Sequence, residues 1–383
     1  MIIKNAKIFH ESKWLNGSVE FNTTINSISS CEIESNNDTI IDAQGMYLLP
    51  GFIDVHTHGA INIDVNHIQN TKEVNKLSLF YASHGTTSFL SSIMSDSIEN
   101  TERVINVLNR SIDESCEGAK LLGIHLEGPF ISKEYKGAMD ERYLKDADSS
   151  LLNHYIELSN NNIKYITVAP EVKNVNDLVK KYSDKIVFSI GHSGASYQLC
   201  ISAIDNGANS ITHMYNAMKL FHQHYPSVVG AALESDVYCE AICDGFHLVP
   251  ATVRLLLKVK GLDRIVAVSD SMMAAGLNEG PYKLGPNTVV VENGDAKLLD
   301  GVRAGSTLTQ DIALKNLIKF TNKPLEKLLP LFTRNPAQML NIYDKKGSIS
   351  INKDADFVLI NKDYEIEKTI VNGKIVFDKN DIN

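Results

Sequence analysis

The sequence predicts an α/β fold, a (β/α)8 TIM-like barrel with a small β-domain built from both termini. Eight short apolar runs lie between residues 50 and 345, and segments of helical periodicity separate them. Strand-like segments with Asn-Gly turns occur at both ends of the chain. With 383 residues and 43% hydrophobic content, the chain can bury one large core and a smaller one.

The two ends of the chain are predicted to form β-hairpins. "KIFHESKWLNGSVEF" is interpreted as two strands around Asn16–Gly17, and "EKTIVNGKIVFD" as two strands around Asn372–Gly373. Asn-Gly supplies the positive φ angles of a tight hairpin turn. Neither end could bury a core alone, so we expect residues 1–49 and 346–383 to form one small β-domain together. The alternative is two independent hairpins packed on the main body.

Residues 50–345 are predicted to form the barrel. Segments such as "SYQLCISAIDNGAN" between the apolar runs have helical spacing and often end in Gly. Strands that alternate with helices predict a parallel sheet, and eight units fit a barrel. A doubly wound open sheet is the alternative, but no Gly-rich phosphate-binding motif follows the first run. The eight runs are "GFIDVHTHG", "GTTSFLSSI", "LLGIHLEGP", "IKYITVAPE", "KIVFSIGHS", "SITHMYNAM", "YCEAICDGFH" and "RIVAVSDSM".

The composition of the chain indicates which kinds of partner and which cellular compartment to expect. A net charge of -9 argues against nucleic acid as the main partner. Five cysteines without a C-x-x-C pair are typical of a reducing compartment. The N-terminus lacks the apolar region of a signal peptide, and no run approaches the roughly 18 apolar residues of a membrane span. We therefore expect a soluble cytoplasmic protein without a membrane partner.

Polar residues at the C-terminal ends of these runs predict a metal site. In a strand, His56 and His58 project to the same side, about 6.5 Å apart along the chain. A barrel brings the C-terminal ends of its strands to one mouth, and imidazole with carboxylate suits zinc or another divalent ion. Each residue alone could instead cap a helix or form a salt bridge, but their joint occurrence favours a metal. The residues are His56, His58, Glu127, His192, His213 and Asp270.

Longer motifs resemble one branch of the amidohydrolase superfamily, the N-acetylglucosamine-6-phosphate deacetylases, along nearly the whole chain. They are "HLEGPFIS", "TVAPE", "SIGHSGAS", "THMYNAM", "DGFH", "VSDSMMAAG", "AGSTLT" and "NPAQML". The resemblance implies a β-sandwich made by both termini, a homodimer, and hydrolysis of the acetamido group of N-acetylglucosamine 6-phosphate. It further implies one or two divalent ions, with Zn, Fe, Mn and Co as candidates.

Residue by residue, the resemblance assigns roles. Glu127, His192 and His213 match the metal ligands shared across the family, and His56 with His58 matches members that hold a second ion. Asp270 matches the catalytic carboxylate, which would accept a proton from the attacking water and pass it to the leaving amine. The expected substrate-binding residues are Asn216, Ala217, His247, Ala138, Met139 and His224.

Two of these residues depart from the family pattern. His224 stands where an Arg normally reaches the phosphate, and Met139 stands where His or Gln normally follows Gly-Ala. A histidine is only partly protonated near neutral pH, and a thioether donates no hydrogen bond. Either His222 and His224 replace the Arg together and the metal alone polarises the carbonyl, or the substrate differs. The alternative substrates are N-acetylgalactosamine 6-phosphate, an unphosphorylated acetamido sugar or another amide. A non-catalytic barrel with a binding or regulatory role is a further alternative.

Overall fold

The barrel predicted from the sequence is present. The computed structural model describes residues 1–31, 33, 39–285 and 287–382. Eight parallel strands form one sheet in the order β15-β14-β13-β12-β11-β10-β9-β6, so chain order and spatial order agree. The strands are β6 (Phe52–Asp54), β9 (Thr86–Met94), β10 (Lys120–Glu127), β11 (Ile163–Val168), β12 (Val187–Ile190), β13 (Ser210–Ile211), β14 (Tyr238–Ile242) and β15 (Ile265–Val268).

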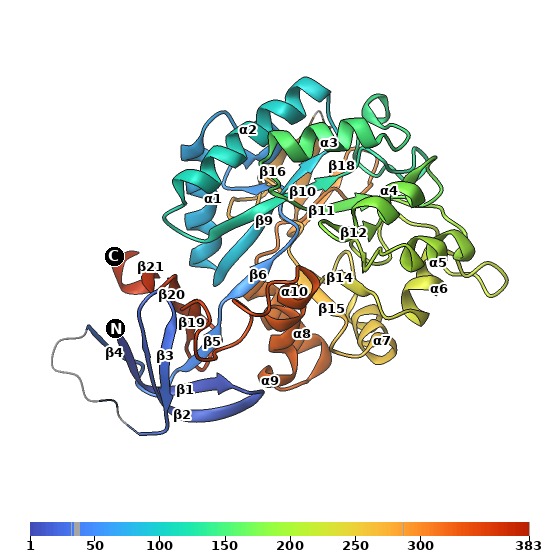
Figure 1. Ribbon diagram of the computed structural model, residues 1–383. Helices are drawn as coiled ribbons and strands as arrows, with labels where there is room; N and C mark the ends of the chain where they lie inside the picture. The colour runs from blue at the N-terminus through green and yellow to red at the C-terminus, as the bar shows by residue number, and fades with distance from the viewer. Residues whose placement is uncertain (32, 34–38, 286, 383) are drawn as a thin grey trace.

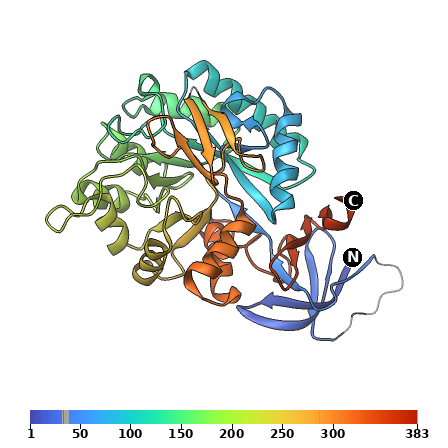
Figure 2. The ribbon, with the colours of Figure 1, turned by 180° about the vertical axis from the view of Figure 1, so that it is seen from behind.

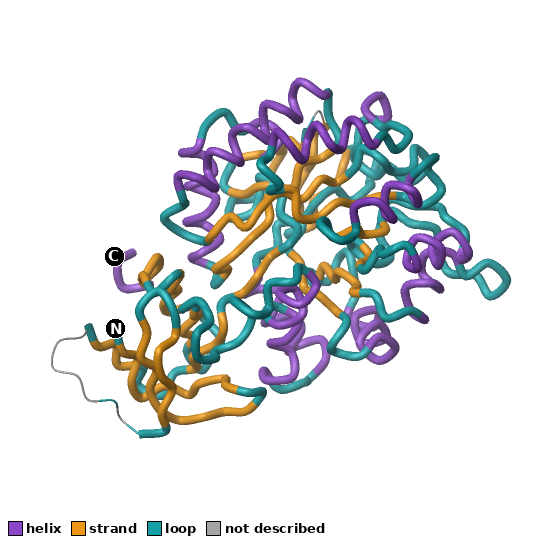
Figure 3. Tube along the Cα trace, in the orientation of Figure 1, coloured by secondary structure: helices purple, strands orange, loops and turns teal. Residues whose placement is uncertain are grey.

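A helix follows each barrel strand and covers the outside of the sheet (Figures 1 and 3). The strands are buried on both faces, as a parallel sheet beneath helices requires. Within the described residues no helix combines the length and the apolar character needed to cross a membrane. The barrel helices are α1 (Thr71–Ser83), α2 (Ile98–Glu114), α3 (Ser149–Leu158), α4 (Val175–Tyr182), α5 (Tyr197–Asp205), α6 (Ser227–Glu234), α7 (Pro250–Lys260) and α8 (Gln310–Thr321), followed by α9 (Leu325–Leu328) and α10 (Arg334–Met339).

The barrel closes between the segments that follow its first and last strands. Thr57 and Ser271 form a parallel bridge. The Asp270 amide donates to the His56 carbonyl at 2.9 Å, and the His58 amide donates to the Ser271 carbonyl at 2.7 Å. Closure therefore occurs at the C-terminal mouth, and it sets His56, His58 and Asp270 side by side.

The β-structure expected from the two termini is an eight-stranded sheet in the order β21-β20-β19-β5-β1-β2-β3, with β4 paired to β1. Figure 1 shows its blue N-terminal and red C-terminal strands beside the barrel. Its strands are β1 (Ile2–His10), β2 (Lys13–Phe21), β3 (Ile25–Ser29), β4 (Ile40–Asp42), β5 (Tyr47–Pro50), β19 (Phe357–Ile360), β20 (Ile366–Val371) and β21 (Lys374–Asp378).

One of the two predicted hairpin turns is wrong. Asn372–Gly373 does join β20 to β21, with φ angles of 48° and 75°. Asn16–Gly17, however, lies inside β2, and the first hairpin turns at Glu11–Ser12, whose φ angles are 48° and 62°. A Cβ on Gly17 would lie 1.9 Å from the Ser29 carbonyl oxygen, so glycine is required here by a close backbone approach rather than by a turn.

We propose a division of the chain into residues 1–49 with 346–383 and residues 50–345. Two observations on strand pairing support this division. First, β5 pairs within the terminal sheet, whereas β6, which begins two residues after β5 ends, pairs within the barrel. Second, the chain re-enters the terminal sheet at β19. The two parts also contact each other, because Thr369 Oγ1 donates to the Ala82 carbonyl in α1 at 2.7 Å.

A third sheet was not predicted. Between β15 and α8 the chain forms an antiparallel sheet of β16 (Gly280–Leu284), β17 (Asn287–Glu292) and β18 (Asp295–Leu298). Figure 2 shows this orange sheet lying over the barrel strands. Its buried apolar residues pack with Met94, Met139 and Met272 near the C-terminal ends of barrel strands. The insertion therefore builds one wall above the barrel mouth.

Candidate active site

The barrel brings all six predicted metal-site residues together at its C-terminal mouth. Each is nine-tenths or more buried. His192, His213 and Asp270 have left-handed backbone φ angles of 48°, 31° and 49°. Such angles are uncommon outside glycine and cluster at functional sites, where the surrounding structure stabilises the strained conformation.

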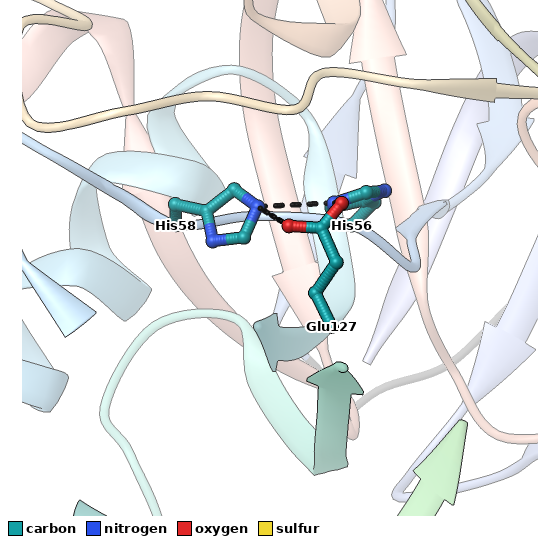
Figure 4. Close-up of side chains that lie close together, drawn as sticks. All are labelled: His56, His58 and Glu127. Atoms are coloured by element: carbon teal, nitrogen blue, oxygen red, sulfur yellow. Dashed lines mark hydrogen bonds and ion pairs between the residues drawn. The ribbon is translucent and has the colours of Figure 1, made fainter. Parts of the chain in front are cut away.

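The first ligand group consists of His56, His58 and Glu127 (Figure 4). The two imidazole Nε2 atoms are 3.0 Å apart, as expected for alternate residues that point to the same side. Glu127 Oε1 lies 3.4 Å from His56 Nε2, and Glu127 Oε2 lies 3.3 Å from His58 Nε2. Both carboxylate oxygens thus take part in this group.

The second ligand group consists of Glu127, His192 and His213. Glu127 Oε1 lies 3.1 Å from His192 Nε2 and 3.2 Å from His213 Nε2. The two imidazole Nε2 atoms are 3.0 Å apart. Because Glu127 belongs to both groups, the arrangement can hold two neighbouring cations through one shared carboxylate.

Two hydrogen bonds fix which imidazole nitrogen faces the site. His56 Nδ1 lies 3.0 Å from Glu240 Oε2, and His192 Nδ1 lies 2.8 Å from the Tyr135 carbonyl oxygen. Both oxygens are acceptors, so each Nδ1 carries a proton and each Nε2 faces Glu127 Oε1. At these distances the nitrogen and the carboxylate oxygen need a cation between them, which is either a proton or a metal ion. The donor set therefore fits a divalent metal ion.

The pKa shifts of these side chains also indicate that the site stabilises positive charge. Burial raises the pKa of Glu127, but the neighbouring His56, His192 and His213 outweigh it and hold the pKa well below its usual range. Burial lowers the pKa of His58, but hydrogen bonds to Asp270 and Glu127 outweigh it and raise the pKa to about 9. The ionised carboxylate stabilises positive charge at this point, and a metal ion bound there would displace the imidazole protons, because a metal ligand must be a neutral imidazole.

Asp270 lies on the edge of the first ligand group. Its Oδ1 is 3.3 Å from His58 Nε2 and 3.6 Å from His56 Nε2. Burial raises its pKa, but the charge of His56 and the hydrogen bond from His58 outweigh this and lower it. An ionised carboxylate beside the ligands can accept a proton from a water molecule activated there.

Glu240 is a site residue that the sequence analysis missed. It is fully buried on β14, where its Oε2 also accepts from the His213 amide at 2.9 Å. Its Oε1 accepts from Tyr165 OH at 2.7 Å. An acidic residue in the apolar run "YCEAICD" is the signal that could have revealed it, since a buried carboxylate needs partners. Glu240 orients one residue of each ligand group.

His125 shows why a buried histidine at this mouth need not be a ligand. It lies two residues before Glu127 on β10, so its side chain points to the same side of the strand as Glu127. Its Nδ1 lies 2.8 Å from Ser92 Oγ, and its Nε2 lies 2.8 Å from Thr167 Oγ1. Both ring nitrogens have neutral partners, and burial lowers its pKa well below the usual value. His125 is therefore a neutral packing residue beneath the site.

A cavity of about 590 Å³ lies above the ligands. It is large enough for a small polar ligand such as a phosphorylated sugar. Five of the six predicted substrate-binding residues line it, and their contact with substrate stays a prediction: Asn216, Ala217, His247, Ala138 and Met139. His58, Glu127, His192, His213 and Asp270 form its floor.

The structure places His224 away from this cavity. It is exposed in the loop between Met218 and α6, and its amide donates to His222 Nδ1 at 3.2 Å. Within one chain, His224 therefore does not lie among the residues that line the cavity. Met139, by contrast, is buried, and its sulfur accepts from the Ser95 amide at 3.4 Å.

Comparisons with known proteins agree with this architecture. The model of the amidohydrolase family matches residues 47–376. N-acetylglucosamine-6-phosphate deacetylase of Bacillus subtilis (strain 168) is 34% identical, with 98% of this chain and 97% of that protein covered. The enzyme of the same name from Homo sapiens is 30% identical over 98% and 94% of the two chains.

Solved structures of similar proteins superpose over nearly the whole chain. N-acetylglucosamine-6-phosphate deacetylase from Thermotoga maritima is 33% identical, with a TM-score of 0.88 and coverage of 99% of this chain and 100% of that chain. The protein of that name from Pasteurella multocida is 30% identical, with a TM-score of 0.92 and 98% of each chain covered. This chain belongs to the amidohydrolase family, within its branch of N-acetylglucosamine-6-phosphate deacetylases.

Proposed function

We propose that this protein hydrolyses the N-acetyl group of N-acetylglucosamine 6-phosphate, releasing glucosamine 6-phosphate and acetate in amino-sugar catabolism. The observation that carries this proposal is the position of Asp270, with Oδ1 3.3 Å from His58 Nε2 on the floor of the cavity. Relatives named for this activity are 30–35% identical over most of the chain. Amide hydrolysis needs an activated water, a proton carrier and a place for the sugar, and the site supplies candidates for each.

The residues that would hold the cofactor are Glu127 with His192 and His213, and Glu127 with His56 and His58. A divalent ion bound there would supply a Lewis acid and a lowered pKa for water. We propose two ions per chain, because both groups are buried and complete and share Glu127. Zinc, iron, manganese and cobalt all accept this mixture of imidazole and carboxylate, so availability decides the native ion.

The reaction proceeds in two proton transfers through Asp270. As the water oxygen forms a bond to the acetamide carbonyl carbon, the Asp270 carboxylate accepts a proton from that water. The C–N bond then breaks, and Asp270 donates the proton to the departing nitrogen. Acetate and the free amine are the products. A neutral amine leaves far more readily than an amide anion, so the proton transfer is what makes the bond cleavage feasible.

The residues on the cavity wall hold the sugar. Asn216, Ala217 and His247 contact its hydroxyl groups and phosphate, and Ala138 with Met139 lies against the acetamido end. Met139 cannot donate a hydrogen bond to the carbonyl oxygen, so a divalent ion held by the ligand groups would supply the stabilisation of the negative charge that develops there. His224 would reach a substrate only through a second copy of the chain.

A cytoplasmic homodimer is part of this proposal. The loop that carries His224 exposes 68% of Leu220, 57% of Phe221 and 69% of Tyr225. Neighbouring apolar side chains at such exposure mark a contact surface, and a second copy of the chain is the partner that would cover them. The mass in solution, measured by sedimentation equilibrium, tests the dimer.

The test of the proposed function is acetate release by metal-replete protein from three sugars run in parallel. They are N-acetylglucosamine 6-phosphate, N-acetylgalactosamine 6-phosphate and unphosphorylated N-acetylglucosamine. We expect the highest kcat/KM with the first. A second candidate function, the same hydrolysis of an unphosphorylated sugar, is favoured by the position of His224 outside the cavity. Preference for the unphosphorylated sugar would establish that candidate and contradict the first.

A further inference from the structure

Arg303 lies on the cavity wall in a segment that the unpredicted sheet positions. Residues 300 and 302–305 line the cavity directly after β18. A backbone hydrogen bond joins the residue after this segment to the residue proposed as the proton carrier: the Ser306 amide donates to the Asp270 carbonyl at 2.7 Å. Arg303 lines the cavity, and its side chain is 38% exposed.

The guanidinium group of Arg303 is held rigidly from one side. Its Nε donates to Asp295 Oδ1 at 2.8 Å, and its Nη2 donates to Asp295 Oδ2 at 2.9 Å. Within the described part of the chain, Nη1 makes no hydrogen bond. Two hydrogen bonds to one carboxylate fix the plane of the guanidinium group and leave its other N–H donors for a second anion.

The charge of Arg303 is not cancelled by Asp295. Lys297 Nζ lies 2.6 Å from Asp295 Oδ2, so one carboxylate is shared by two cations. The cluster of Asp295, Lys297 and Arg303 therefore carries a net charge of about +1 at neutral pH. Lys297 does not line the cavity, whereas Arg303 does.

His247 is a second basic group on the same wall. Its Nδ1 lies 2.6 Å from Asp244 Oδ2, which leaves Nε2 for another partner. Burial lowers the pKa of His247, but the hydrogen bond and charge of Asp244 outweigh it and raise the pKa. Arg303 and His247 both line the cavity, and the Asp244 carboxylate acts on both of them. With His247 protonated, the two aspartates and three basic groups of this wall sum to a charge of about +1, which favours an anion there.

We propose that Arg303, together with His247, binds the phosphate group of the substrate and sets the preference for a phosphorylated sugar. Arg303 supplies, from the same chain, the permanent positive charge that the sequence lacks at position 224. A phosphate carries up to two negative charges and accepts hydrogen bonds in the geometry that a guanidinium offers. This inference rests on the proposed function, since it names the residue that selects its substrate.

The test compares Arg303→Leu with Lys297→Gln, which removes a charge from the same Asp295 cluster outside the cavity. We expect Arg303→Leu to lower kcat/KM for N-acetylglucosamine 6-phosphate about 10- to 100-fold, the range for a lost hydrogen bond to a charged group. The kcat/KM for unphosphorylated N-acetylglucosamine should stay unchanged. Lys297→Gln leaves Asp295 to Arg303 alone, so it should lower kcat/KM for the phosphorylated sugar by less than Arg303→Leu does and leave the value for the unphosphorylated sugar unchanged. Arg303→Lys keeps the positive charge but loses the planar guanidinium group. Its kcat/KM for the phosphorylated sugar should lie between that of the unmodified protein and that of Arg303→Leu.

Equal losses on both sugars, or no loss on the phosphorylated one, would overturn the assignment. A selective loss in His224→Ala with none in Arg303→Leu would transfer the role to the partner subunit. If the protein releases acetate from no sugar, the proposed function fails, and binding of glucosamine 6-phosphate measured by calorimetry decides the inference separately. Weaker binding by Arg303→Leu than by Lys297→Gln would then support the phosphate site, and equal binding would overturn it.

Discussion

Replacing Asp270 by Asn should lower kcat for acetate release by about 10²- to 10⁴-fold, the contribution typical of a positioned acid–base group. Asn keeps the size of the side chain and a hydrogen-bonding oxygen near His58, which lies 3.3 Å from Asp270 Oδ1. The amide cannot accept and return a proton at neutral pH. The ligand groups stay complete, so metal content should change little.

The measurement is kcat together with metal content by plasma emission spectrometry on the same sample. Asp311→Asn is a matched control, because Asp311 Oδ1 also lies beside an imidazole, 3.0 Å from His84 Nδ1, but outside the cavity. It should keep both kcat and metal. Turnover by Asp270→Asn near that of the unmodified protein would remove Asp270 from the mechanism.

Replacing Glu127 by Gln should abolish metal binding at both ligand groups and reduce activity to background. A neutral amide cannot replace the charged carboxylate. The two carboxylate oxygens of Glu127 face the imidazoles of His56, His58, His192 and His213. Loss of a hydrogen bond that only orients a ligand lowers metal affinity about 10- to 100-fold. Loss of the ligand Glu127 itself should lower it further. The four histidines would then lose the charge that draws a cation to them.

Glu240→Gln provides the comparison within the same site. It removes a charge that orients His56 from behind, yet leaves every atom of both ligand groups in place. We expect its metal affinity, measured by competition with a chelating dye, to fall only about 10- to 100-fold. Equal effects of Glu127→Gln and Glu240→Gln would contradict the assignment of Glu127 as the shared ligand.

The barrel could be predicted because its signals are local. Each strand is a short apolar run, each helix has its own periodicity, and the parallel order follows from their alternation. His56 and His58 lie beyond β6, on either side of the Thr57–Ser271 bridge, and their alternation about Thr57 directs both rings to the same side, with their Nε2 atoms 3.0 Å apart. Because the C-terminal strand ends of a barrel share one mouth, the sequence also predicts that Glu127 and Asp270 lie beside the two histidines.

The parts that could not be predicted depend on contacts between distant segments. Asn16–Gly17 has the composition of a turn, but the approach of β3 makes glycine necessary inside β2. The insertion of β16 to β18 does carry a turn signal at Asn293–Gly294, with φ angles of 52° and 81°. Nothing in that signal says that the following segment reaches the barrel mouth, so Arg303 could be recognised only from the structure.

Metal reconstitution is the most direct test of the central claim, that this chain is a metal-dependent deacetylase. The protein would be stripped with a chelator, and acetate release from N-acetylglucosamine 6-phosphate followed while zinc, manganese or cobalt is added back. We predict background turnover without metal and a rise that saturates by about two ions per chain, one for each ligand group. Undiminished turnover by the metal-free protein would contradict the account.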